Sequence, residues 1–150
     1  MKYLSFRRAG VASWGLLKDG GIVDLGGEAA DLRAFIAAGC PGAEALAARP
    51  VSLALSDVVL DPVIPNPSKI VMAAINYYEA DTDPAKVPEY PVLFLRLPAS
   101  QIGHGAALLQ PRSSQKLDFE GELAVIIGQG GRYIPQDQAL AHVAGYSIYN

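Results

Sequence analysis

Three acidic residues, Asp118, Glu120 and Glu122, alternate with other residue types directly before an apolar run. If they lie on one β-strand, their side chains point the same way and are spaced by about 6.6–6.8 Å. Ionised carboxylates beside buried surface repel one another and lose hydration, a cost that a bound cation offsets. Since carboxylate oxygens favour hard ions, the pattern predicts a Mg²⁺ or Mn²⁺ site. The spacing alone leaves open a solvated acidic face without a ligand.

A strand must align these acids, and the sequence predicts one over residues 117–128. Residues 123–127 are apolar on both faces, which is typical of a central strand buried from both sides. The glycines that follow lack the spacing of a nucleotide-binding loop and predict a turn. Pro135 then begins a predicted helix through His142, with Leu140 turned inward, and residues 144–149 are predicted to be extended again.

The first 61 residues predict a small domain of their own. Three β-type runs, 3–6, 12–17 and 21–25, are separated by turn residues and form a β-meander. Asp31 is the predicted N-cap of a helix ending at Gly39, and an alanine-rich helix spans 42–48. These helices are expected to cover the meander, with Trp14 and Phe35 in the core.

Three prolines within six residues mark a linker over 62–68, because each removes a backbone donor and favours an extended predecessor. A second domain is predicted over 69–150. It begins with β-runs at 69–75 and 91–97, and the polar segment 78–90 between them is typical of a surface loop.

Composition narrows the function classes. The net charge of -3 leaves no basic surplus for nucleic-acid phosphates or anionic lipids, so neither is an expected partner. Cys40 is the single cysteine, which excludes an internal disulfide and a cysteine-based zinc site and suits a reducing compartment. Arg7 and Arg8 interrupt any export signal, and no apolar run reaches the roughly 20 residues that span a bilayer. The sequence predicts a cytoplasmic protein without a membrane partner.

Residues 116–128 read KLDFEGELAVIIG, which resembles the signature strand of the fumarylacetoacetate hydrolase family. The segments 75–77, 87–94, 100–105 and 143–146 also resemble family elements. The resemblance is specific over 69–150 and loose before it. It implies an α+β, β-rich fold, in which the N-terminal β-meander with helices is followed by the start of a mixed β-sandwich roll.

By this resemblance, Glu120 and Glu122 are two of three carboxylate ligands of a Mg²⁺ or Mn²⁺ ion. Asp118 either orients those ligands without touching the ion or is structural. The third ligand, an aspartate, is expected immediately after Asn150, together with the rest of the family domain. Asn150 itself offers one weak amide oxygen. The metal site is therefore expected to be incomplete over residues 1–150.

The resemblance also implies a loop that closes over the substrate, and one departure from the family pattern occurs there. Family hydrolases carry a His–acid pair at positions that read Ala80 and Asp83 in this chain. Alanine transfers no proton, so hydrolysis by that pair is in doubt. If the alignment is shifted by one residue, Glu79 or Asp81 takes the place of the missing base. The candidate catalytic residues are Asp83 and Glu79.

The expected substrate contacts are Asn76 and Tyr77 at the loop entrance, and Arg96 and Gln101 after the following strand. An arginine guanidinium can bind a carboxylate with two parallel hydrogen bonds, although a strand-end arginine is often only solvated. Two histidines are weighed as well. His104, in the sequence Gly-His-Gly, is expected to be part of a structural turn and less so to act as a catalytic base. His142 is expected to be an ordinary surface residue.

The leading hypothesis is a metal-dependent hydrolase that cleaves a C–C bond in a small 2-oxo or 1,3-dicarbonyl carboxylic acid. A decarboxylase or keto–enol isomerase of the same family is the alternative, because such chemistry depends less on the His–acid pair. A non-catalytic family member and a purely structural acidic edge also stay open. By resemblance, the partner is a small keto acid and the chain is a homodimer.

Overall fold

The computed structural model describes residues 1–78 and 80–150. These residues form two compact units, one made of Met1–Ile64 with Ile102–Asn150 and the other of Pro65–Gln101. Strands dominate, accompanied by short α-helices and 3-10 helices. The α+β, β-rich fold class is therefore confirmed, whereas the domain boundaries at 61 and 68 stay predictions.

A curled antiparallel sheet occupies the beginning of the chain. β1 (Lys2–Arg8) pairs with β2 (Val11–Lys18), and β2 pairs with β3 (Gly21–Asp24). Between β2 and β3, Asp19 and Gly20 have φ values of 49° and 77°, the positive angles that a tight two-residue hairpin turn requires. The predicted meander is confirmed.

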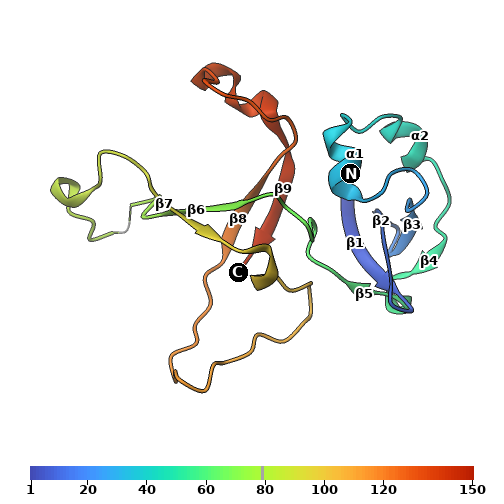
Figure 1. The fold of residues 1–150 in the computed structure, drawn as a ribbon, viewed down its shortest axis with the longest axis horizontal. Coiled ribbons are helices and arrows are strands. Elements are labelled where there is room, and N and C mark those ends of the chain that lie inside the picture. The colour runs from blue at the N-terminus through green and yellow to red at the C-terminus, as the bar shows by residue number, and fades with distance from the viewer. Residues whose placement is uncertain (79) are drawn as a thin grey trace. The chain divides into compact units, whose positions relative to one another are not determined.

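Two helices pack on this sheet and complete its core. α1 (Leu32–Ala37) begins at Asp31, whose side-chain oxygen accepts a hydrogen bond of 2.7 Å from the Ala34 N–H. α2 (Ala43–Ala47) follows, and Figure 1 shows both helices beside the first sheet. The helical residues Leu32, Phe35 and Leu46 share one buried cluster with Trp14, Leu16, Val23 and Leu25. The predicted N-cap, helices and core aromatics are confirmed.

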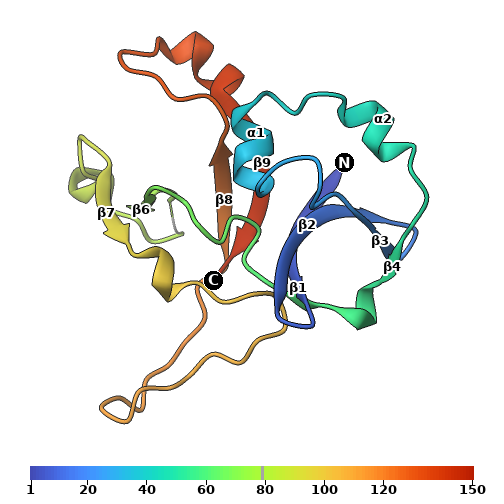
Figure 2. The same ribbon diagram turned by 45° about the vertical axis from the view of Figure 1, so that its right-hand side comes forward.

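Two short strands finish the sheet at opposite edges. β4 (Leu53–Ala54) pairs with β3, and after the 3-10 helix η1 (Leu55–Asp57), β5 (Val59–Leu60) pairs with β1. The strand order is β4-β3-β2-β1-β5, and Figure 2 shows how strongly β1 and β2 curve. Beyond β5, the Asp61 N–H donates to the Ser5 carbonyl at 3.0 Å, and the Ser5 hydroxyl donates to the Val63 carbonyl at 2.8 Å. These bonds fix the start of the proline-rich segment against β1.

The unit of residues 65–101 is built on a β-hairpin. β6 (Ile70–Ala74) pairs antiparallel with β7 (Val92–Arg96) from Ile70 opposite Arg96 to Ala74 opposite Val92. The loop between them contains the 3-10 helix η2 (Pro84–Lys86), and η3 (Pro98–Ser100) follows β7. Both predicted strands are confirmed.

A second hairpin follows a long connection. Residues 102–121 contain neither helix nor strand, as Figures 1 and 2 both show. β8 (Glu122–Ile127) then pairs with β9 (Val143–Tyr149), and the 3-10 helix η4 (Gln136–His142) lies between them. The predicted extended segment 144–149 is confirmed by β9.

The prediction of one long central strand over 117–128 is wrong in two respects. The strand begins at Glu122, because this residue lies opposite Tyr149, the last residue of β9, and the preceding residues lack a ladder. Within the described residues β8 pairs with β9 alone, and Leu123 and Ile127 are 67% and 60% exposed. An apolar run thus predicted a strand correctly and its burial incorrectly.

The segment before β9 also differs from its prediction. It is a 3-10 helix, and Leu140, which was expected to face inward, is 77% exposed. Since most helical stability in proteins comes from packing an apolar face, this segment lacks what would favour a longer α-helix. No helix among the described residues is long and apolar enough to cross a bilayer.

Candidate functional site

The two predicted metal ligands lie at the start of β8. Glu122 is the first residue of the strand, is half-buried and stands opposite Tyr149. Glu120 lies two residues earlier and is exposed, and its backbone N–H donates a hydrogen bond of 2.9 Å to the Asn150 side-chain oxygen. Both residues are therefore attached to the end of β9, one through the ladder and the other through a side chain.

Asp118 is engaged differently. Its Oδ1 accepts a hydrogen bond of 2.8 Å from the N–H of Phe119, so this carboxylate bonds to its own neighbouring backbone. Among the residues that the structure describes, no three His, Cys, Asp or Glu side chains gather closely enough to hold a metal ion. The predicted row of three acids on one strand is wrong, because Asp118 and Glu120 precede the strand.

The remaining pair fits a hard divalent ion in its chemistry. Mg²⁺ is commonly bound by one or two carboxylates while water and substrate oxygens complete its coordination. Glu120 and Glu122 supply two carboxylates, and the exposure of Glu120 leaves room for such water. These two residues would hold Mg²⁺ or Mn²⁺. Asn150 is a poorer ligand, since its amide oxygen already accepts from Glu120.

The predicted substrate contacts at the loop entrance belong to the unit 65–101. Asn76 and Tyr77 follow β6 and are exposed. The preceding Ile75 has φ 53°, a left-handed conformation that is strained for a β-branched side chain. Strained backbone conformations cluster at active sites and ligand-binding sites. Here the strained residue turns the chain out of β6 just before the Asn-Tyr pair.

The candidate bases lie further along the same loop. Asp83 is exposed, and its Oδ1 accepts from the Ala85 N–H at 3.0 Å while its Oδ2 lies 3.6 Å from the Lys86 ammonium. This carboxylate therefore caps η2. Ala80 and Asp81 are exposed as well, and Glu79 lies outside the described residues.

Arg96 and Gln101 lie on either side of η3 in the same unit. Arg96 is the last residue of β7 and is half-buried opposite Ile70. Gln101 is half-buried at the end of η3, and its Nε2 is 3.5 Å from the Pro98 carbonyl oxygen. Arg96 and Gln101 therefore both lie at the end of the hairpin where β7 runs into η3.

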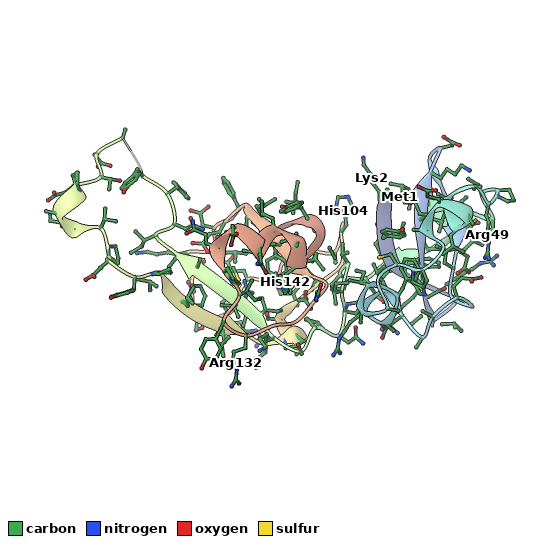
Figure 3. The ribbon with its side chains drawn as sticks, turned by 90° about the horizontal axis from the view of Figure 1, so that it is seen from above. Met1, Lys2, Arg49, His104, Arg132 and His142 are labelled. Carbon is green, nitrogen blue, oxygen red and sulfur yellow. The ribbon has the colours of Figure 1, made fainter. Side chains whose placement is uncertain are left out.

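The two histidines lie in turns and contacts of the backbone. His104 is exposed in a turn closed by a hydrogen bond of 3.1 Å from the Ala106 N–H to the Gly103 carbonyl, as the sequence predicted. His142, labelled in Figure 3, ends η4, and its Nδ1 lies 2.8 Å from the Gln129 carbonyl oxygen. His142 is half-buried, and its contact with the Gln129 carbonyl joins η4 to the end of β8.

Sequence reasoning missed one feature of the site and one feature of the connection that leads to it. The hydrogen bond from Glu120 to Asn150 follows from the register of β8 and β9, which a hairpin prediction could have supplied. Gly103 lies so close to β5 that an added Cβ would clash with the Leu60 carbonyl oxygen. A glycine between Ile102 and His104 was the available signal, since glycine permits close backbone approach.

Comparison with known proteins places these residues among relatives. The family described as fumarylacetoacetate (FAA) hydrolase C-terminal matches residues 69–150, more than half of the chain. Oxaloacetate tautomerase YisK of Bacillus subtilis is 40% identical over 101 residues, 64% of this chain and 34% of that protein. The human mitochondrial oxaloacetate tautomerase FAHD2A is 35% identical over 105 residues, 69% of this chain and 33% of that protein.

Solved structures of similar fold carry related names. A probable 2-hydroxyhepta-2,4-diene-1,7-dioate isomerase from Mycobacterium abscessus has a TM-score of 0.73 at 31% identity, covering 99% of this chain and 51% of that one. The fumarylacetoacetate hydrolase of Exiguobacterium antarcticum has a TM-score of 0.68 at 29% identity, covering 99% of this chain and 54% of that one. The chain spans about a third of the length of these curated relatives and about half of these solved structures.

Proposed function

Because this chain belongs to the fumarylacetoacetate hydrolase family, we propose that it forms part of an enzyme that interconverts the keto and enol forms of a small 2-oxo carboxylic acid. Two relatives are named oxaloacetate tautomerases, and one similar structure is named an isomerase. These names favour proton transfer over C–C hydrolysis as the reaction. Oxaloacetate is the first substrate to test.

The observation that carries this choice is Ala80 in the loop after β6. The family's hydrolytic pair needs an imidazole at this position to activate water, and a methyl group cannot accept a proton. Tautomerisation moves a proton between carbon and oxygen without an attacking water. The carboxylates of Asp81 and Asp83 in the same loop can accept and return such a proton.

The other residues serve binding and orientation. Glu120 and Glu122 would hold Mg²⁺ or Mn²⁺, which would supply electrostatic stabilisation to an oxygen that gains negative charge. Arg96 offers a planar donor pair to the substrate carboxylate. Asn76 and Tyr77 offer an amide and a phenol beyond the strained Ile75. A small keto acid is therefore the proposed ligand.

The experiment that tests this proposal follows enol oxaloacetate by ultraviolet absorbance and its products by NMR, with and without Mn²⁺. We expect Mn²⁺-dependent loss of enol with keto oxaloacetate as the product. Glu120→Gln combined with Glu122→Gln should lower the rate by roughly tenfold or more, by the scale of lost metal-site interactions. Glu44→Gln combined with Asp137→Asn removes two exposed charges elsewhere and should leave the rate unchanged.

Other products would select the other candidates. Two carboxylic acids from an acylpyruvate would favour C–C hydrolysis, which the similar structure named fumarylacetoacetate hydrolase supports as the second candidate. Pyruvate with carbon dioxide would favour decarboxylation. Binding of oxaloacetate without any turnover would favour a non-catalytic member and would rule the tautomerase proposal out.

We also propose that the chain forms a homodimer. Exposed apolar residues on β8, Leu123, Val125 and Ile127, offer a surface that association can bury. Sedimentation velocity across a concentration series should show a dimer, and a single monomeric species at all concentrations would contradict this.

A further inference from the structure

The end of the β8–β9 hairpin has a defined register. Leu123 stands opposite Ile148 and Glu122 opposite Tyr149. The same register places Gly121 opposite Asn150, one step beyond the last strand pair. Asn150 is therefore in position to reach the backbone that precedes β8.

The Asn150 side chain makes that connection. Its Oδ1 accepts the hydrogen bond of 2.9 Å from the Glu120 N–H, so a side-chain amide takes the place that a backbone carbonyl holds within a ladder. Upstream, the Phe119 N–H bonds locally to Asp118. Glu120 is thus the point where the long connection 102–121 is attached to the end of β9.

This attachment matters because Gly121 separates the two carboxylate residues. An added Cβ at Gly121 would meet nothing within 4 Å, so close packing is not what places a glycine there. Glycine also has wide conformational freedom. With Glu122 held by the ladder and Glu120 held by Asn150, the flanking residues on both sides of this glycine are fixed to the same strand.

We propose that Asn150 is a positioning residue that holds Glu120 beside Glu122 before a divalent cation binds. The inference rests on the proposed role of these glutamates as metal ligands. Ordering ligands in advance removes part of the entropy cost of binding, so loss of the Asn150 acceptor lowers cation affinity without removing a ligand.

The test combines amide hydrogen exchange of Glu120, measured by NMR on the metal-free chain, with Mn²⁺ binding measured by electron paramagnetic resonance. Asn150→Ala removes the acceptor, whereas Asn150→Asp keeps an oxygen at the same place. Gln110→Ala is the matched control, because it removes another exposed amide of the connection, whose Nε2 donates to the Ser114 carbonyl at 2.9 Å.

Asn150→Ala should speed Glu120 exchange and weaken Mn²⁺ binding, each by roughly three- to tenfold, the scale of one hydrogen bond. Asn150→Asp should keep slow exchange and at least the parent affinity, and Gln110→Ala should match the parent in both measurements. Unchanged Glu120 exchange in Asn150→Ala would overturn the proposal. Unchanged Mn²⁺ affinity in Asn150→Ala, with affinity lost in Glu120→Ala combined with Glu122→Ala, would overturn it equally.

The proposed function can fail separately. If the parent chain binds no Mn²⁺, Glu120 and Glu122 do not hold the ion within residues 1–150, and Asn150 has no ligand-ordering role in this chain. Faster Glu120 exchange in Asn150→Ala would then still assign Asn150 to holding the backbone before β8.

Discussion

The first sheet and the β8–β9 hairpin use similar apolar residues with opposite results. In the first sheet, Trp14 and Phe35 are almost fully buried with their neighbours. In β8, the alternate residues Leu123, Val125 and Ile127 are all exposed. Within the described residues, every buried side chain lies between Ser5 and Leu53.

The difference lies in what supplies the second layer. In the first sheet, α1 and α2 follow the meander directly and cover it, so burial needs only nearby sequence. β8 and β9 form a two-stranded ladder, which is marginally stable alone in water. The candidate ligands Glu120 and Glu122 thus lie where order depends on interactions from further away.

The largest effect should come from deleting an aromatic ring in the first core. Phe35 packs against Trp14 with ring centroids 4.7 Å apart, and Phe35→Ala should lower the free energy of unfolding by about 3–5 kcal/mol. Urea denaturation followed by Trp14 fluorescence measures it. Phe119→Ala is the same substitution at a 79% exposed site and should cost less than about 0.5 kcal/mol. Equal costs would break the comparison between the two regions.

A smaller effect is expected where the connection 102–121 meets the first sheet. Gly103→Ala places a Cβ against the Leu60 carbonyl, and overpacking of this kind costs about 1–3 kcal/mol. Gly130→Ala is the control, since an added Cβ there meets nothing within 4 Å. Thermal unfolding by circular dichroism should show a lower midpoint for Gly103→Ala alone. A midpoint equal to that of the parent would mean that the connection 102–121 does not pack against β5.

The α1 cap should contribute about 1 kcal/mol. Asp31→Ala removes the acceptor of the Ala34 N–H, and loss of such a cap costs about 0.5–2 kcal/mol. Asp31→Asn retains an acceptor and should recover most of the loss in the same urea titration. If alanine and asparagine behave alike, the cap is not what starts this helix.

The smallest effect concerns alkaline pH. Burial raises the pKa of the Tyr3 phenol above its ordinary value of 10.0, and the nearby Cys40 thiolate adds to the rise. Because the folded pKa is the higher one, the contribution is complete below the unfolded pKa and is lost as pH rises through the folded pKa. Thermal midpoints of the parent should therefore fall above about pH 10. Tyr3→Phe should show a shallower fall, and identical slopes would exclude Tyr3 as the cause.

Much of the first region could be predicted from sequence because its signals are local. Asp31 is a capping residue followed by helical spacing, and Asp19-Gly20 is a hairpin turn between two apolar runs. Trp14 lies within a β-type apolar run, and Phe35 repeats at helical spacing with Leu32. Each prediction required only the residues adjacent to the element.

The site region could be predicted less completely, for physical reasons visible at particular residues. The apolar run 123–127 predicted a strand, yet periodicity could not say that β8 would begin at Glu122, because that depends on where β9 ends. Leu140 was placed inward on a helical pattern, although nothing nearby covers it. Strand limits and burial depend on the partner that packs against an element, and one sequence segment does not contain that partner.

The pairing of β5 with β1 has a consequence for the order of folding. The hairpins β1–β2 and β2–β3 join neighbouring residues, and such hairpins form in about 1–10 μs. β5 must find β1 across most of residues 1–64, as the ion pair between Arg7 and Asp61, 54 positions apart, shows. Since loop closure costs entropy before distant contacts reward it, we expect the three-stranded meander to appear first and β5 to join it in the rate-limiting step.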